Sequence, residues 1–124
     1  MITALLRVTD IQASIDWYTG IGFSLLLTNQ EWLPEDPVNW CMLDYGGSRL
    51  MLNDGAAPAT GRQRDAAVFV DADDVPALYE KLRTKAKVLH ELYTTFYGRV
   101  EFILEDPDGY PITFGMDASD TDGE

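Results

Sequence analysis

The sequence has almost none of the residues that thiol chemistry and soft metals require. Cys41 is the only cysteine and His90 the only histidine among 124 residues. An intrachain disulfide is therefore excluded, as is any metal site built from several thiolates or imidazoles of one chain. Neither residue lies in a recognisable catalytic motif, which disfavours a Cys–His catalytic pair. We expect Cys41 to be a small buried hydrophobic residue and His90 to be an ordinary, partly buried histidine on a strand.

Lysine and arginine are scarce as well. Nine basic residues stand against 21 acidic ones, which gives a net charge of −12. Because proteins bind phosphate backbones mainly through clustered Lys and Arg, this balance argues against a nucleic-acid partner. Strong negative charge suits a cationic ligand, but it is also a common route to solubility. Charge alone therefore leaves the ligand open.

Long apolar runs are missing too. The sequence contains no stretch of about 18 apolar residues, and its first ten residues, MITALLRVTD, lack the basic region and apolar run of a secretory signal. These absences predict a cytoplasmic protein with no membrane span. With 46% hydrophobic residues the chain can bury one core, and we expect one domain over residues 1–116. The acidic tail 117–124 is expected to be disordered.

Hydrophobic spacing predicts the same order of elements twice. In the first half, an apolar run at 2–8 leads to Thr9 or Asp10 as a helix N-cap. The apolar residues that follow at helical spacing are Ile11, Ile15 and Tyr18. Three further strands are expected at 23–29, 39–43 and 48–53, with a turn at 44–47 between the last two and a linker at 54–61.

The second half begins again with a strand at 66–70 and a helix capped by Asp73 or Asp74, with Pro76 in its first turn. Strands are then expected at 88–95, 99–105 and 110–116. Two local matches support a repeat: Asp10 aligns with Asp74, and DYGGSRLMLND aligns with DPDGYPITFGM. The repeat predicts two similar modules, at about 1–54 and 65–116, that share one sheet, because each alone would leave an apolar face uncovered.

Three segments carry a family resemblance. LLRVTDIQASIDWYTGIGF, AAVFVDADDVPALYEKL and TFYGRVEFILEDPDGYPITFG resemble the opening strand and helix, their mid-chain counterpart and the closing strands of the glyoxalase, bleomycin-resistance and dioxygenase (vicinal oxygen chelate) superfamily. The resemblance covers residues 2–116. It implies an α+β fold of two βαβββ modules that form a curved, cupped eight-stranded mixed sheet around a cleft. In the superfamily's active members, a divalent metal is bound there by one residue on each of four strands.

Carried onto this chain, the metal-binding positions of the resemblance fall at Thr3, Met51 with Arg49 on the same face, near Ala67, and Thr113. Metals of this class prefer imidazole or carboxylate ligands, and none of these side chains offers one. No metal, cofactor or catalytic residue is therefore expected. The chain is closest in character to the bleomycin-resistance-like members, which are metal-free homodimers that sequester a bulky cationic antibiotic in clefts at the dimer interface. A homodimer and a small aromatic or cationic ligand are expected here.

Candidate contacts for such a ligand combine aromatic faces with charge. Two tryptophans flank an acidic group of Glu31, Glu35 and Asp36, and Tyr93 stands near two more aromatic residues at the turn before Arg99. Strand alternation turns Leu50, Leu52, Phe102 and Leu104 toward the helices, and Arg49, Met51, Arg99, Glu101 and Ile103 toward the cup. The predicted ligand-binding residues are Trp32, Trp40, Arg49, Met51, Phe96, Tyr97, Arg99 and Glu101.

Simpler interpretations of these residues stay open. Trp40 could fill the core or the dimer interface, whereas Trp32, in a polar loop, is the better candidate for an exposed contact. Arg49, Arg99 and Glu101, joined by Arg7, could form an ion pair that replaces the metal as a structural centre.

Three functional classes remain. The first, which we favour, is a metal-independent binding protein. The second is an enzyme of the superfamily (a lyase, isomerase or dioxygenase) with a non-standard site, in which Glu101 would be the general base near Arg49 or Arg99. The third is an interaction protein whose sheet mainly makes a dimer. Sequence alone determines neither the ligand nor whether modules pair within a chain or between two chains.

Overall fold

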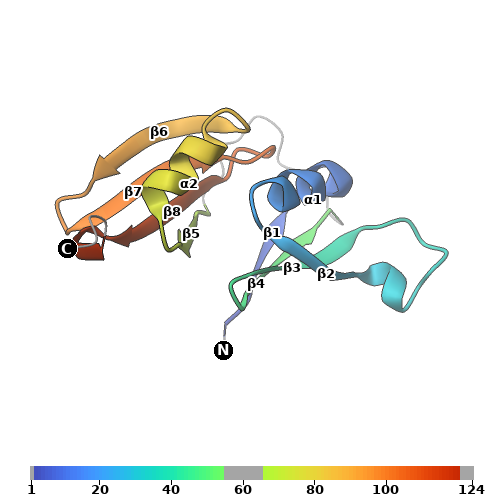
Figure 1. The fold of residues 1–124 in the computed structure, drawn as a ribbon. Helices are drawn as coiled ribbons and strands as arrows, with labels where there is room; N and C mark the ends of the chain where they lie inside the picture. Colours follow the sequence, from blue (N-terminus) through green and yellow to red (C-terminus); the bar gives the residue numbers. More distant parts are fainter. Residues whose placement is uncertain (1, 55–65, 121–124) are drawn as a thin grey trace. The chain divides into compact units, whose positions relative to one another are not determined.

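The computed structural model describes residues 2–54 and 66–120 (Figure 1). The chain divides into two compact units, residues 1–62 and 63–124. Each unit contains one module of the order β-α-β-β-β, as the repeat in the sequence predicted. Apart from Asp54, the predicted linker at 54–61 lies outside the described residues, as do residues 121–124 of the tail.

The first module forms a four-stranded sheet in the order β1-β4-β3-β2. Its elements are β1 (Ala4–Arg7), α1 (Ile11–Gly20), β2 (Ser24–Thr28), the short 3₁₀ helix η1 (Asn29–Glu31), β3 (Trp40–Tyr45) and β4 (Ser48–Asn53). Strand β1 pairs with β4 in parallel, and the other pairs are antiparallel. The side chain of Asp10 accepts a hydrogen bond from the backbone N of Ala13 at 3.0 Å, which confirms the predicted N-cap of α1.

The second module repeats this topology in the order β5-β8-β7-β6. Its elements are β5 (Val68–Asp71), α2 (Val75–Leu82), β6 (Lys87–Thr94), β7 (Arg99–Glu105), β8 (Pro111–Asp117) and the 3₁₀ helix η2 (Ala118–Asp120). Asp74 caps α2 by accepting from the backbone N of Ala77, and Pro76 lies in the first turn. Residues 117–120, expected to belong to a disordered tail, thus complete β8 and form η2.

The turn between β3 and β4 is shorter than predicted. Strand β3 continues through Asp44 and Tyr45, and only Gly46 and Gly47 connect it to β4. These two glycines have φ angles of 58° and 91°. A two-residue hairpin with a type I′ turn needs positive φ at both central positions, and glycine supplies it without steric cost. The Gly-Gly pair therefore lets β3 continue by two residues, so that Asp44 pairs with Arg49 and Tyr45 with Ser48.

Strand alternation places the core of each module on the face covered by its helix. In the first module Leu50 and Leu52 are buried, together with Ile15 and Tyr18 of α1. In the second, Figure 1 shows α2 lying over β7 and β8. There the buried side chains on the helix face are Val75, Leu82, Val100, Phe102, Leu104, Ile112, Phe114 and Met116. The positions predicted to face the helices are thus confirmed. The side chains between them lie on the opposite face of each sheet, away from the helix.

The described helices are short. Helix α1 has 10 residues and α2 has 8. Within residues 2–54 and 66–120, no helix has both the length and the apolar character needed to cross a membrane.

Candidate ligand-binding site

Strand register in the second module brings four residues into one row. Asp71 of β5 pairs with Gly115 of β8, Gly115 pairs with Glu101 of β7, and Glu101 pairs with Tyr93 of β6. The row lies on the face turned away from α2, because the neighbouring residue Phe102 belongs to the core. Polar side chains from β5, β7 and β6 therefore meet on one face of a single sheet, with Gly115 of β8 between them.

Glu101 is the centre of this face. Its residue is only 3% exposed. The hydroxyl of Tyr93 donates to Oε1 at 3.3 Å, and the hydroxyl of Tyr97 lies 3.1 Å from both carboxylate oxygens. The Nε atom of Arg99 is 3.8 Å from Oε2, an ion-pair distance that is too long for a hydrogen bond. Neutral phenols therefore supply the close contacts of a buried carboxylate.

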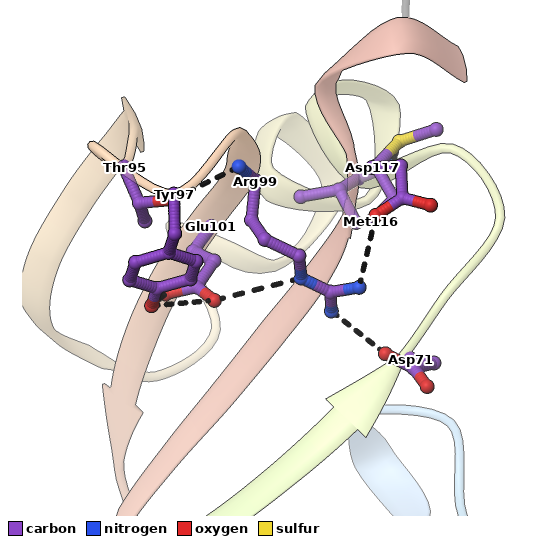
Figure 2. A network of polar contacts seen from close by, with 8 residues as sticks. Asp71, Thr95, Tyr97, Arg99, Glu101, Met116 and Asp117 are labelled. Carbon is purple, nitrogen blue, oxygen red and sulfur yellow. Dashed lines mark hydrogen bonds and ion pairs between the residues drawn. The ribbon is translucent and has the colours of Figure 1, made fainter.

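The guanidinium of Arg99 makes its shortest contact with Asp71 rather than with Glu101. Its Nη2 donates to Oδ1 of Asp71 at 2.7 Å, and its Nη1 lies 3.7 Å from Oδ1 of Asp117. The hydrogen bond to Asp71 raises the pKa of Arg99, so the group stays cationic. Figure 2 shows the side chain extended from β7 past β8 toward Asp71 at the end of β5. One cation is thus surrounded by three carboxylates. We call this group of Asp71, Tyr93, Tyr97, Arg99, Glu101 and Asp117 the Glu101 cluster.

The two phenols stay protonated in the neutral pH range. Partial removal from water raises the pKa of Tyr93, and the negative charge of Glu101 raises it further. For Tyr97, partial removal from water and then the hydrogen bond to Glu101 raise the pKa. Both hydroxyls therefore act as donors to the carboxylate, and each keeps an oxygen lone pair for another partner.

The turn between β6 and β7 presents aromatic side chains beside the cluster. The turn is held by hydrogen bonds from the backbone N of Thr95 to the carbonyl of Arg99 at 2.7 Å and from Gly98 back to Thr95. Phe96 is 99% exposed and contacts the ring of Tyr97 edge-on at 5.0 Å. The structure thus brings four of the predicted residues, Phe96, Tyr97, Arg99 and Glu101, together in one module.

His90 differs from the prediction. Its side chain is exposed rather than partly buried, because it lies on β6, the edge strand of its sheet. The ring packs against Tyr93 at a centroid distance of 4.0 Å, and Nδ1 lies 2.8 Å from the carbonyl oxygen of Glu91. His90 is therefore a neighbour of the Glu101 cluster through Tyr93.

The remaining predicted residues lie in the first module. Trp32 is 67% exposed and Trp40 is half-buried, and their ring centroids are 6.2 Å apart. Asn29 fixes the loop between them: its side chain donates to the carbonyl of Pro37 and accepts from the backbone N of Asn39. The two predicted tryptophans thus lie near each other, and the loop presents Trp32 on a defined scaffold.

Arg49 and Met51 lie on β4. The Nη1 atom of Arg49 is 3.8 Å from the sulfur of Met42, and Met51 is half-buried opposite Met42 in the register. Arg7 lies on β1 beside Asn53. The ion pair expected between Arg99 and Glu101 is present in the second module, while the participation of Arg49 and Arg7 stays a prediction.

The donor set implied by the resemblance does not fit a metal. Thr3 and Met51 are half-buried, Ala67 is exposed, and Thr113 is buried, but none of them supplies a carboxylate or an imidazole. Among residues 2–54 and 66–120, no three His, Cys, Asp or Glu side chains come together in a metal-binding group.

Cys41 behaves as the sequence predicted. It is fully buried on β3, and burial raises the pKa of its thiol from an ordinary 9.0 to about 11. We expect the native thiol to react with a disulfide reagent at pH 8 at least about 100-fold more slowly than the unfolded chain, because the thiolate is the reacting form. Stopped-flow absorbance with and without denaturant measures both rates. Equal rates would mean that the thiol is accessible.

Comparisons with known proteins agree with this architecture. The model of the Glyoxalase/Bleomycin resistance protein/Dioxygenase superfamily matches residues 2–114. No curated protein matches the sequence.

Several solved structures have the same fold at low identity. TioX from Micromonospora sp. ML1 is 22% identical, with a TM-score of 0.73 over 93% of this chain and 94% of that one. A bleomycin resistance determinant encoded on the transposon Tn5 is 17% identical, with a TM-score of 0.69 over 94% and 97%. A bleomycin-binding protein complexed with bleomycin is also 17% identical, with a TM-score of 0.68 over 94% and 98%. Because the family match spans most of the sequence and both modules have the expected topology, the chain belongs to the glyoxalase/bleomycin resistance protein/dioxygenase superfamily.

Proposed function

We propose that the protein is a metal-independent binding protein that sequesters a small aromatic or cationic ligand at a homodimer interface, with the Glu101 cluster as the contact for the ligand's cationic group. The observation that carries this proposal is the environment of Glu101. A carboxylate that is 3% exposed receives its close hydrogen bonds from two neutral phenols. Buried charges are normally compensated by an opposite charge in direct contact, and a cationic ligand would supply one.

The charge balance of the cluster supports the same ligand class. Arg99 is the one cation whose ion pairs join the cluster in the described residues, and it faces Asp71, Glu101 and Asp117. Its shortest contact, at 2.7 Å, is with Asp71 rather than with Glu101. The excess of negative charge around Glu101 therefore favours a second cation over an anion.

Aromatic side chains near the cluster suit a ligand that carries a flat or quaternary cation. Phe96 and Tyr97 present exposed rings on a turn that is held by backbone hydrogen bonds. A cation over such rings gains roughly 0.5–2 kcal/mol. The tilted Trp32–Trp40 pair offers a further stacking surface in the first module. One protein of this fold is named as a bleomycin-binding protein, which supports carrying the ligand class to this chain as a proposal.

Thermal melting of the purified protein tests the proposal. We expect bleomycin, or a simple aromatic cation such as benzyltrimethylammonium, to raise the Tm by roughly 10 °C at 100-fold its Kd, because a ligand that binds only the native state stabilises it. Sedimentation should give twice the 13.9 kDa mass of one chain. A rise with manganese, nickel or zinc and none with the cations would contradict metal-independent binding.

The second candidate is an enzyme of the superfamily with a non-standard site. The observation in its favour is the contact between the Tyr97 hydroxyl and both oxygens of Glu101, a phenol and a carboxylate that can exchange a proton. Chemical change of the ligand during incubation with the protein would favour this candidate. Recovery of the ligand unchanged would favour sequestration.

A further inference from the structure

Gly115 occupies the centre of the row that crosses the second sheet. It lies on β8 between Asp71 and Glu101 in the register. A Cβ built at this position would lie 2.6 Å from Nη2 of Arg99 and 3.1 Å from Cγ of Glu101. Real Cβ atoms do not approach other heavy atoms to 2.6 Å. Any side chain at 115 would therefore meet the guanidinium of Arg99, and the absence of a side chain is what gives Arg99 its path over β8.

This path decides which carboxylate Arg99 contacts. With Gly115 in place, Nη2 of Arg99 lies 2.7 Å from Asp71, while Nε stays 3.8 Å from Glu101. If a side chain at 115 moved the guanidinium away from Asp71, the nearest carboxylates left would be Glu101 at 3.8 Å and Asp117 at 3.7 Å. A shift of about 1 Å would bring Nε into hydrogen-bond range of Glu101.

We propose that Gly115 is a positioning residue: the open space above it lets Arg99 hydrogen-bond to Asp71 rather than to Glu101. The Glu101 carboxylate therefore receives no hydrogen bond from the guanidinium. The consequence for binding rests on the function proposed above: an Arg99 that closed onto Glu101 would compete with the ligand's cationic group. The positioning itself can be measured without any ligand.

The tyrosines of the cluster report the position of Arg99. Partial removal from water and the hydrogen bond to Glu101 raise the pKa of Tyr97, the charge of Glu101 raises it further, and the charge of Arg99 lowers it. Charged or titratable groups around these phenols come from every strand of the sheet: Asp71 from β5, His90 from β6, Arg99 and Glu101 from β7, and Asp117 from β8. Neutralising Glu101 by a closer Arg99 should therefore lower the pKa values of Tyr93 and Tyr97.

Gly115→Ala tests the proposal, with Gly20→Ala as the matched control. Gly20 ends α1, and a Cβ there meets nothing within 4 Å. Carbon NMR of Cζ-labelled tyrosine follows each phenol through its titration. In Gly115→Ala we expect the pKa of Tyr97 to fall by about one unit, and in Gly20→Ala we expect no change. A folded Gly115→Ala protein with unchanged titration of Tyr93 and Tyr97 would overturn the proposal.

A second comparison covers the case in which Gly115→Ala fails to fold. In an Arg99→Ala background the 2.6 Å clash with the guanidinium is gone and only the 3.1 Å contact with Cγ of Glu101 is left, so the double variant should fold nearly as well as Arg99→Ala alone. The pKa of Tyr97 in the double variant should then equal the pKa of Tyr97 in Arg99→Ala. An equal shift with and without Arg99 would show that Gly115 acts by another route.

Binding of benzyltrimethylammonium separates this proposal from the proposed function. If the natural sequence binds the cation, Gly115→Ala should weaken binding about tenfold, since Arg99 then competes for Glu101. If the natural sequence binds no cation but the tyrosine titrations shift as expected, the binding function fails and the positioning role stands. Cation binding that persists unchanged in Gly115→Ala, with unshifted tyrosines, would reject the positioning role alone.

Discussion

Replacing Phe102 with alanine is expected to lower the free energy of unfolding by about 4 kcal/mol. Phe102 is fully buried on β7, a central strand of the second sheet. Its ring stacks on Phe114 of β8 at 5.2 Å and contacts Tyr79 of α2 at the same centroid distance. Truncation would leave a cavity where helix and sheet meet, and the aromatic contacts would be lost with the buried area.

Phe96→Ala is the matched control, because it removes the same atoms from a ring that is 99% exposed. Its free energy of unfolding should stay within about 0.5 kcal/mol of the natural sequence. Denaturant unfolding followed by circular dichroism measures both variants. Equal losses in the two variants would show that Phe102 does not anchor the core.

The same experiment tests whether residues 1–116 form a single domain. All three tryptophans, Trp17, Trp32 and Trp40, lie in the first module. If the modules unfold together, Phe102→Ala should move the tryptophan fluorescence transition as far as the circular dichroism transition. A fluorescence transition that stays in place would mean that the first module is stable without the second.

Local patterns predicted most of the fold. The helix caps at Asp10 and Asp74 could be predicted because the signal is local: an aspartate directly precedes apolar residues at helical spacing. Both caps are present. Alternation correctly placed Leu52 and Leu104 in the core, because side-chain direction in a strand has a period of two residues. The turn between β3 and β4 was predicted to be longer than it is, because two consecutive glycines also allow the tighter two-residue hairpin that the structure has.

The candidate site was only partly predictable. Arg99 and Glu101 lie two residues apart on one strand, so alternation placed them on one face. Asp71 and Gly115 were missed because their contacts with Arg99 depend on the pairing of β5, β8 and β7, which a single sequence does not determine. The repeat did contain a clue to Gly115. In the two matched segments Gly115 aligns with Asn53, so the sequence shows that the second module has no side chain at a position where the first module has one.

Glu101→Gln is expected to remove recognition of the cationic group while the protein stays folded. Glutamine keeps the shape of the side chain and an acceptor for the hydroxyls of Tyr93 and Tyr97, but it removes the buried charge. Arg99 keeps its 2.7 Å contact with Asp71. Affinity for benzyltrimethylammonium should fall roughly 10- to 100-fold, the effect of losing a charged contact of about 1.5–3 kcal/mol. Isothermal calorimetry measures this change.

The pH dependence of stability is a second, independent test of Glu101→Gln. Partial removal from water raises the pKa of both tyrosines in the native state, and Glu101 raises it further. The protonated phenols therefore stabilise the fold at neutral pH, and this contribution is lost as the pH rises through the raised native pKa values. Without the charge, these pKa values should fall toward the ordinary tyrosine value, and the free energy of unfolding should decrease less as the pH rises through this range.

Glu105→Gln provides the control for net charge. Glu105 lies on the same strand and pairs with Lys87 at 3.3 Å. This variant should bind the cation as the natural sequence does, because a change of one charge outside the cluster is screened by water and salt. Equal losses in both variants would point to a general effect of negative charge. Unchanged affinity in Glu101→Gln would instead assign the Glu101 cluster a structural role and move the search for the ligand contact to Trp32 and Trp40.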